Sequence, residues 1–445
     1  MNKVLESIKK IDYRLFFALI ILALMPTIYL TVRVNFLGNL PGDWGFNIAS
    51  QLSWVHLLYE IVQEALILPL FFIMGKSLFK KDEFENKVRT GLLFTFNVYF
   101  FLSIIVFLFA RPLVLFMAQQ DVLVDATVNY IRLETFASIF LTLAKFITLV
   151  LVTMKKDKYL YIILAVQMVM TILLDTFLIS NLSFSLNLGV NGIAITNIIV
   201  NIILLAVAFG LLSKENIFVF NTKLKMTFSW MKEWFKVGLY SGIESFVRNL
   251  AFMIMIIRMI NVVAEQGAFW NGNNFIWGWL LLPILALGDL IKKEVAEDKQ
   301  NISKNTLGYF TITTIIVVIW LISIPFWKPF LNSVMNLSDY EKIFNLILVQ
   351  LFFYIVFAYN NVMDSTFYGV GKTEYMLYQS LIVNIIFYGG AFILYTTGVF
   401  VPTLTGVALM FGLGMLFDMI PTAYLYFRLL KKESINILIF SSKNI

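Results

Sequence analysis

Apolar residues dominate this chain in long runs that are separated by short polar segments. Twelve of these runs reach the length of about 18 or more residues that a membrane-spanning α-helix needs. Their expected bounds are 14–36, 47–74, 88–110, 122–152, 159–180, 188–212, 232–258, 269–291, 306–327, 341–368, 374–397 and 403–428. The pattern predicts an all-α polytopic membrane protein with twelve transmembrane helices.

An apolar motif occurs twice, about half the chain apart. A Leu-Pro pair, a glycine and a charged cluster follow one another around Pro69 and again around Pro283. The same spacing carries Gly192 onto Gly406. Repeated helical units are how many transporters build two halves around a central site. Because each proline removes a helix hydrogen bond, we expect Pro69 and Pro283 to kink their helices.

The repeat predicts two pseudo-symmetric lobes of six helices each. The N-lobe is expected over 1–212 and the C-lobe over 232–445. The polar segment 213–231 between them is expected to be a cytoplasmic linker, since it is the only long polar interruption of the apolar pattern.

Basic residues are distributed unevenly between the apolar runs. Most of the 34 Lys and Arg residues lie in the N-terminus, in five alternate loops and in the C-terminus, whereas the other six loops hold only Arg111, Lys328 and Lys342. Cytoplasmic loops are enriched in Lys and Arg. We therefore expect a multi-pass protein of the plasma (inner) membrane with both termini in the cytoplasm. The net charge of +7 reflects this topology and anionic lipid, so no nucleic-acid partner is expected.

Composition argues against several other classes of protein. Sixty per cent of the residues are hydrophobic and only 14% are charged, more apolar surface than one soluble core can bury. The chain has no cysteine and one histidine, which limits metal and acid–base chemistry. It also lacks a paired-aspartate motif for a metal pyrophosphate, so a membrane-embedded transferase is disfavoured. We expect no enzyme activity, no resident metal and no cofactor besides a coupling ion.

Ionisable side chains inside membrane helices are costly and usually face a cavity or a partner. His56, Glu60 and Glu64 are spaced four apart in the second run and form one polar stripe. Two carboxylates on adjacent turns repel each other, and burial disfavours their charge, which suits a proton or small-cation site. In the alternative interpretation, the stripe satisfies Arg132 and Lys145 of the fourth run as buried pairs.

Asp175 lies among leucines in the fifth run. It either serves a cation site or caps the outer end of its helix. We expect Asp175 and Glu60 together to bind the driving cation, with Na+ possible at both, or to carry the driving proton. The polar stripe is then expected within reach of Asp175 or Arg132.

Further charges within the runs are expected to form substrate contacts or charge pairs. Glu244 and Arg248 are four apart in the seventh run and can neutralise each other. Asp418 lies mid-span in the twelfth run without an evident partner. Charges close to the ends of runs are expected to reach the membrane surface: Arg33 and Arg258 outside, Asp289 and Asp364 inside.

Three short stretches carry a resemblance to a known family. These are Asn129-Tyr130-Ile131-Arg132, then Thr171-Ile172-Leu173-Leu174-Asp175 with Leu188-Gly189-Val190-Asn191-Gly192-Ile193-Ala194, and Phe367-Tyr368-Gly369-Val370-Gly371-Lys372-Thr373. With them the chain resembles the multidrug and toxic compound extrusion (MATE) family of the multidrug/oligosaccharidyl-lipid/polysaccharide flippase superfamily.

The resemblance implies a V-shaped antiporter that exchanges inward-moving Na+ or H+ for outward-moving, often cationic, amphipathic compounds. Asp175 matches the family's helix-five carboxylate, which is part of an N-lobe cation site. The helix-one aspartate expected near Leu30 is missing, and Arg33 stands close by. The acidic residues that the family can carry in helices seven and ten would fall near Arg248 and Phe357.

Two functions remain open from the sequence. The leading hypothesis is a cation-coupled exporter that works by alternating access, with a small-molecule substrate, the lipid bilayer as its environment and no other subunit. The alternative is a flippase of a lipid-linked cell-envelope precursor. A flippase favours a basic cavity for pyrophosphate, and the residues that would supply it are Arg33, Arg132, Lys145 and Arg248.

Overall fold

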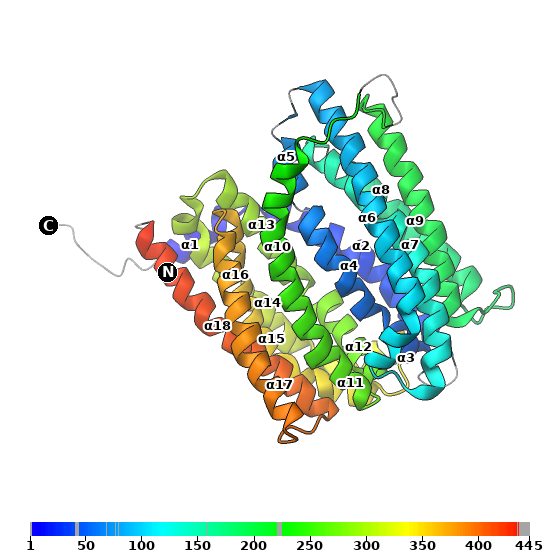
Figure 1. Cartoon of the computed structure of the whole chain (residues 1–445). Helices are drawn as coiled ribbons and strands as arrows, with labels where there is room; N and C mark the ends of the chain where they lie inside the picture. The colour runs from blue at the N-terminus through cyan, green and yellow to red at the C-terminus, as the bar shows by residue number, and fades with distance from the viewer. Residues whose placement is uncertain are drawn as a thin grey trace. The chain divides into compact units, whose positions relative to one another are not determined.

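The computed structural model describes residues 2–40, 44–67, 69–75, 77–78, 80–156, 158–219, 225–433 and 435. Helices, turns and loops make up all of these residues, and none of them lies in a strand (Figure 1). Residues 220–224 of the predicted linker lie outside the described part of the chain. Internal contacts divide the chain into a central unit, Ile28–Gly267, and a terminal unit, Met1–Thr27 with Ala268–Ile445.

The central unit begins within the first long helix, α2 (Tyr13–Leu37), and ends just after α12 begins. Its further helices are α3 (Trp44–Ala49), α4 (Leu52–Leu66), α5 (Leu70–Gly75), α6 (Lys81–Phe116), α7 (Val124–Thr153), α8 (Lys158–Leu178), α9 (Gly189–Lys214), α10 (Met231–Phe252) and α11 (Arg258–Val262). A 3-10 turn, Asp121–Leu123, precedes α7, and a π-helical turn, Met253–Ile257, joins α10 to α11.

The terminal unit begins with the short helix α1 (Asn2–Lys9) and the first part of α2. Its other helices are α12 (Gln266–Phe275), α13 (Leu282–Glu297), α14 (Asn301–Pro329), α15 (Tyr340–Gly369), α16 (Thr373–Ile382), α17 (Gly389–Thr396) and α18 (Leu404–Lys432). Three π-helical turns interrupt these helices, at Ile276–Leu280, Phe330–Val334 and Val383–Tyr388.

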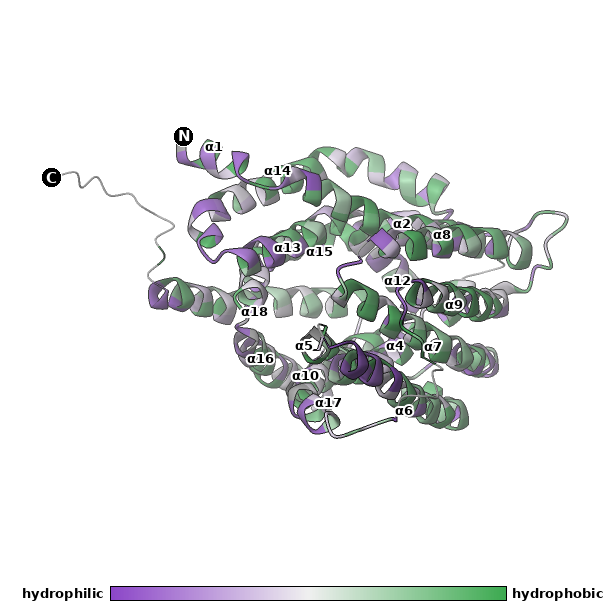
Figure 2. Ribbon diagram, turned by 90° about the horizontal axis from the view of Figure 1, so that it is seen from above, coloured by the Kyte–Doolittle hydropathy of each residue, from purple (hydrophilic) through white to green (hydrophobic). Residues whose placement is uncertain are grey.

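Among the described residues, nine helices are long and apolar enough to cross a membrane. The bent pair Gln266–Leu280 and Leu282–Glu297 brings the number to ten when it is counted as one span. Large apolar side chains such as Leu108 and Ile322 are exposed on these helices, as lipid-facing positions are. The apolar colouring of the long helices is visible in Figure 2. The chain is therefore a multi-pass membrane protein.

Helical segments cover all twelve predicted runs, but two of them are not among these spans. The segment around 47–74 is divided into α3, α4 and α5, and the segment around 232–258 is α10 with its π-helical turn. Twelve transmembrane helices in two lobes of six therefore stay a prediction. These two segments also carry the acidic stripe and its partners, which makes them the polar exceptions of the fold.

Both repeated prolines mark breaks in their helices, as predicted. Pro69 follows the end of α4 at Leu66 and precedes α5. Pro283 lies in the first turn of α13, just after a bend of 53°. A proline has no backbone N–H, so the carbonyl four residues before it loses its helical partner. The kinks therefore follow directly from the sequence.

Helix α7 is the central element of the first unit. It packs against α6 and α9 and also contacts α3, α4, α5 and α8, and more of its apolar span is buried than in any other span among the described residues (Figure 1). Small and hydroxyl side chains such as Ala137, Ser138 and Thr142 occupy its buried faces. Because these side chains are short, the neighbouring helices can approach α7 closely.

Helix α10 packs on α4 through a pair of glycines four residues apart. A Cβ atom added to Gly238 would lie 1.9 Å from the carbonyl oxygen of Ala65, and one added to Gly242 would lie 2.8 Å from the Cβ of Ala65. Ala65 is the residue whose carbonyl Pro69 leaves without a helical partner. The glycines thus let α10 approach the free end of α4.

Three side chains of α10 donate to carbonyls of α4. Trp234 Nε1 bonds the Leu66 oxygen at 2.6 Å, Ser241 Oγ bonds the Glu64 oxygen at 2.8 Å, and Asn249 Nδ2 bonds the Leu57 oxygen at 3.3 Å. The last carbonyls of a helix need partners outside it. This packing places α10 in the central unit, so the unit boundary differs from the predicted lobe boundary at 212–232. The division into lobes stays a prediction.

The glycine contact yields a test of stability. We expect Gly238→Ala to lower the free energy of unfolding by about 1–3 kcal/mol, because the new methyl group overlaps a backbone oxygen and the helices must separate. The matched control is Gly210→Ala in α9, where an added Cβ meets no atom within 4 Å. Thermal unfolding of the purified protein in detergent measures both. Equal melting temperatures for Gly238→Ala and the native protein would contradict the packing.

Candidate functional site

A buried ion pair joins α2 to α8 in the central unit. Arg33 Nε lies 2.7 Å from Asp175 Oδ2, and Arg33 Nη2 lies 3.2 Å from Asp175 Oδ1, so the guanidinium binds both carboxylate oxygens. Arg33 is only 8% exposed and Asp175 only 1%. The expectation that Arg33 reaches the membrane surface was wrong, because Asp175 offers it a buried counter-charge with matching geometry.

Glu134 of α7 lies beside this pair and is 2% exposed. Asn197 Nδ2 of α9 donates to Glu134 Oε1 at 2.7 Å, and Tyr130 also hydrogen-bonds to its carboxylate. Glu134 interacts electrostatically with both Arg33 and Asp175. We call Arg33, Asp175 and Glu134 the buried charge network. It contains one basic and two acidic side chains.

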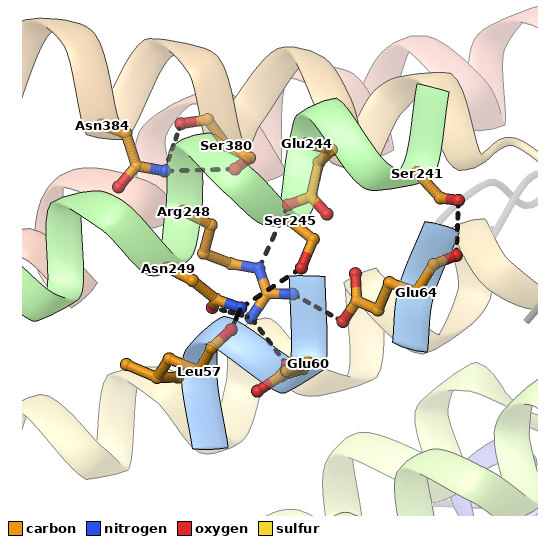
Figure 3. Close-up of polar contacts among 10 residues, drawn as sticks. All are labelled: Leu57, Glu60, Glu64, Ser241, Glu244, Ser245, Arg248, Asn249, Ser380 and Asn384. Carbon is orange, nitrogen blue, oxygen red and sulfur yellow. Dashed lines mark hydrogen bonds and ion pairs between the residues drawn. The ribbon is translucent and has the colours of Figure 1, made fainter. Parts of the chain in front are cut away.

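A second cluster forms where α10 meets α4, as Figure 3 shows. Arg248 Nη2 lies 2.7 Å from Glu64 Oε1, its Nε lies 3.2 Å from Glu244 Oε1, and its Nη1 lies 3.5 Å from Glu60 Oε1. Three carboxylates therefore surround one guanidinium. We call these four residues the Arg248 cluster.

The side chains of the Arg248 cluster are only partly buried. The Arg248 side chain is 41% exposed and that of Glu60 is 35% exposed, whereas Glu64 and Glu244 are less than 20% exposed. Arg248 Nη1 also donates a hydrogen bond of 3.3 Å to Asn249 Oδ1, which helps to orient the guanidinium. The predicted pairing of Glu244 with Arg248 is present, but Arg248 also neutralises part of the stripe on α4.

The two carboxylates that were predicted to act together pair with different arginines. Asp175 belongs to the buried charge network, and Glu60 belongs to the Arg248 cluster. Glu64 shares the cluster with Glu60, and His56, one turn earlier on α4, is exposed. The polar stripe thus exists, but its partner is α10 and not Arg132 or Asp175. The functional roles of these residues stay predictions.

Two predicted partners of the stripe have other contacts. Arg132 Nε donates to the Phe107 carbonyl at 3.2 Å, and its guanidinium lies over the Phe107 ring at 5.1 Å. Lys145 is exposed and donates to Gln63 Oε1 at 3.1 Å, while Glu60 lies near enough to attract its charge. The alternative interpretation, in which Arg132 pairs with the stripe, was therefore wrong, since α6 supplies Arg132 with a carbonyl and a ring.

In the terminal unit, Asp418 of α18 has a partner that the sequence did not indicate. Asn360 Nδ2 of α15 donates to Asp418 Oδ2 at 3.2 Å. Asp364 lies one turn further along α15 and accepts a hydrogen bond from Gln379 of α16. Asp418 acts electrostatically on Asp364, so two acidic side chains of this unit lie near each other.

Glu134 of the buried charge network was not predicted as a functional residue, and Arg33 was predicted only for the basic cavity of the flippase alternative or at the membrane surface. Arg33 lies near the end of its run, where a basic side chain can reach the membrane surface, and Glu134 shares its run with Arg132 and Lys145. Arg132 and Glu134 differ by two residues and therefore point to different faces of α7, so the spacing indicates separate partners for them. The contact between Arg33 and Asp175 had no signal in the spacing.

Comparison with known proteins finds one family model that is similar to part of the chain. The model of the MatE family matches residues 79–177. No curated protein matches the sequence. The match covers α6 and α7 and nearly all of α8, the helices that carry Glu134 and Asp175.

Solved structures share the fold across nearly the whole chain. One, described as the inward-facing conformation of a multidrug resistance MATE family transporter of the MOP superfamily, has a TM-score of 0.74 at 16% identity and covers 92% of this chain and 96% of its own. An outward-facing structure of such a transporter has a TM-score of 0.65 at 14% identity, with coverages of 98% and 99%.

A third similar structure is a MOP superfamily transporter from Pyrococcus furiosus, described as having a binding pocket of reverse polarity that suggests a different function. Its TM-score is 0.66 at 16% identity, and it covers 97% of this chain and 99% of its own. The resemblance found in the sequence is thereby confirmed: a MatE family model matches residues 79–177, and the fold is similar to that of solved MATE family transporters of the MOP superfamily.

Proposed function

We propose that the protein is a cation-coupled exporter of small cationic or amphipathic compounds, which it exchanges for Na+ or H+ across the inner membrane. Its fold matches transporters described in inward-facing and in outward-facing conformations, which are the two end states of alternating access. The proposal includes cytoplasmic termini, a monomer as the working unit and no catalytic step. The coupling ion and the substrate class are argued from the two charge clusters.

The charge balance of the buried charge network carries the proposal. With all three groups ionised, Arg33 offsets only one of the two carboxylates, and one negative charge is left over. An uncompensated charge in a buried site is costly. A proton on Glu134, or a Na+ ion beside it, removes the excess. The network therefore favours the uptake of one monovalent cation.

Asp175 and Glu134 have different roles in this proposal, because only Asp175 is bound by Arg33. Both oxygens of Asp175 already bind the guanidinium, so a cation can reach Asp175 only by displacing Arg33. Glu134 has neutral hydrogen-bond donors instead. In this proposal Asp175 holds Arg33 in place, and Glu134 carries the exchangeable charge. The resemblance implied a cation at Asp175, and the tethered guanidinium takes that place here.

Coupling requires that the cation binds one conformation more tightly than the other. A tenfold difference in affinity between the inward-open and outward-open states corresponds to about 1.4 kcal/mol. Access of water to Glu134 in one state and its burial in the other supplies a difference of this size. The cation gradient can then bias the direction of transport.

The Arg248 cluster supports a cationic substrate. Glu60, Glu64 and Glu244 outnumber Arg248 by two, and Lys145, which Glu60 attracts, offsets part of this negative charge. A positively charged ligand can replace the longest of these ion pairs, the one with Glu60, at small cost. The flippase alternative has less support, because it needs basic residues that are free to bind a pyrophosphate. Arg33 and Arg248 are already paired with carboxylates, and Arg132 lies against Phe107.

The charge balance predicts the phenotype of a neutral variant at Glu134. In proteoliposomes loaded with a fluorescent lipophilic cation, we expect a Na+ or H+ gradient to drive export by the native protein. Glu134→Gln should abolish the dependence of export on the ion gradient, because the neutral side chain can no longer bind Na+ or exchange a proton. Equilibrium binding of the lipophilic cation should stay intact. The matched control is Glu341→Gln, at an exposed side chain of α15.

If Glu134→Gln retains the full gradient response, the exchangeable cation is bound elsewhere. Separate Na+ and H+ gradients, applied to the same vesicles, identify the ion.

The ion pair predicts a non-additive effect on stability. Asp175→Asn should cost about 3 kcal/mol of the free energy of unfolding, since it breaks the two-oxygen ion pair of a buried guanidinium and leaves Arg33 only the electrostatic attraction of Glu134. The double variant Arg33→Gln with Asp175→Asn should recover most of this loss. Thermal unfolding in detergent measures each variant. A double variant that is no more stable than Asp175→Asn alone would speak against the pairing.

The Arg248 cluster predicts a change in substrate affinity. Glu60→Gln should weaken the binding of a monovalent lipophilic cation by roughly tenfold, or about 1.4 kcal/mol, because one carboxylate charge of the cluster is lost. Binding of an uncharged analogue of the same size should not change. Fluorescence polarisation with the purified protein measures both ligands. An equal loss for the two would show that the effect is structural and not electrostatic.

A further inference from the structure

The short helix α1 lies against the first turns of α14 in the terminal unit, as Figure 2 shows. The backbone N–H of Gly308 donates to Ser7 Oγ at 2.8 Å. A Cβ atom added to Gly308 would lie 2.9 Å from Ile11 Cδ1 and 3.0 Å from the carbonyl oxygen of Ser7. The glycine therefore lets α1 pack directly on the backbone of α14.

A buried glutamate of α13 fixes the corner between α1 and α2. Glu294 is 7% exposed, and its Oε1 accepts a hydrogen bond of 2.9 Å from the backbone N–H of Asp12. Its Oε2 accepts from Asn305 Nδ2 at 3.0 Å and from the Tyr309 hydroxyl. The Asp12 carboxylate in turn accepts from the Leu15 N–H at 3.0 Å, at the start of α2. The N-terminal segment is thus docked at defined positions of α13 and α14.

The place of this contact along α14 indicates how deep α1 lies in the membrane. The apolar span Asn301–Val334 has 34 residues and is therefore roughly 50 Å long. The hydrocarbon core is about 30 Å thick, which leaves about 10 Å of a centred span at each end for the headgroup region. Gly308 lies roughly 10 Å along the axis from Asn301. Helix α1 therefore lies at the boundary between headgroups and hydrocarbon.

The exposed polar side chains of this segment are mainly basic. Between residues 3 and 14 the sequence has four basic and two acidic side chains. Lys9, Lys10 and Arg14 are exposed and form no ion pair in the described part of the chain. One of the two acids already caps α2 through its carboxylate. An excess of positive charge therefore remains on the exposed side of α1.

Exposed apolar side chains accompany this charge. Leu5 is 48% exposed and lies one turn before Lys9 on the same face of α1. Phe17 is 58% exposed in the second turn of α2. Ser7 and Ile11, which face α14, are buried. Basic side chains next to exposed apolar ones are typical of helices that lie in the membrane interface.

We propose that α1 and the first turns of α2 form a docking surface for the headgroups of anionic phospholipids. Lys9, Lys10 and Arg14 bind the lipid phosphates, and Leu5 and Phe17 contact the acyl chains. In the proposed topology this surface lies at the cytoplasmic leaflet, which carries the negative lipids. The docked helix holds the basic groups at one depth, so that the surface retains anionic lipid beside α13 and α14. The inference goes beyond the proposed transport function, and its test measures no transport.

The test determines which lipid lies next to α1 in the full-length protein. Because the chain has no cysteine, a fluorophore attached at Glu6→Cys reports on α1 alone. The labelled protein is reconstituted into phosphatidylcholine vesicles that contain a small fraction of nitroxide-labelled phosphatidylglycerol or, in parallel, the same fraction of nitroxide-labelled phosphatidylcholine. The ratio of the two quenching constants gives the local preference for the anionic lipid.

We expect this ratio to be roughly fivefold or more in the labelled protein, and to fall as the salt concentration rises. Combining Lys9→Gln, Lys10→Gln and Arg14→Gln should reduce the ratio to about one, since the attraction is electrostatic. The control with the same loss of charge should keep the preference. It replaces by glutamine three exposed lysines on the same side of the predicted topology: Lys155, Lys158 and Lys214.

A ratio near one before any lysine is replaced would overturn the proposal and leave the basic surface to another partner, such as an acidic protein segment. An equal loss in the control would also overturn it, because net charge alone would then explain the effect. Gly308→Val keeps every charge but displaces α1, so it should lower the ratio. If the folded Gly308→Val protein keeps the full preference, a loose basic segment is sufficient and the docked surface is refuted. Gel filtration establishes folding, and the variant without the three basic side chains carries the test if Gly308→Val is not folded.

Discussion

Charge neutrality in a buried environment is the constraint on which the central unit depends. The ion pair of Arg33 with Asp175 shows how strong this constraint is. Arg33 lies near the end of its helix, yet its side chain is buried against the Asp175 carboxylate. Once the guanidinium is there, it determines what Asp175 can bind. It also leaves Glu134, one helix away, as the carboxylate with an unmatched charge.

The same constraint organises the contact between α4 and α10. The glutamates of α4 have no arginine or lysine on their own helix, and Arg248 of α10 supplies the missing charge. The glycines and the three side-chain donors of α10 bring that arginine close enough to act. Packing and electrostatics therefore act together at this interface. The glycines allow α10 to approach α4 closely, and the ion pairs determine how the two helices are aligned along each other.

Sequence patterns predicted the fold well where one physical signal dominated. Long apolar runs identified the membrane helices, and the two prolines identified the helix breaks, because both effects are local in the chain. Charge partners could not be predicted in the same way. Arg33 and Asp175 are far apart in sequence, and Glu60 could pair with Lys145, Arg132 or Arg248 until the helices were placed next to each other.

Spacing along a single helix predicted the members of the Arg248 cluster on each helix, but not that the two helices are neighbours. The stripe of Glu60 and Glu64 was visible as a repeat of four, as was the pair of Glu244 and Arg248. That the two stripes face each other depends on which helices are neighbours, and this follows from the glycines of α10. A pair of glycines four apart opposite a proline-terminated helix is a pattern that sequence analysis can include.

The dependence of α4 on α10 has a consequence for the order of biosynthesis. The ribosome makes α4 long before α10, and more than 160 residues separate Leu66 from Met231. During that interval the carbonyls at the end of α4 and its two glutamates lack the partners that they have in the finished protein. The first half of the chain therefore cannot satisfy these polar groups by itself after insertion. They gain their partners only when α10 has been made and packs against α4.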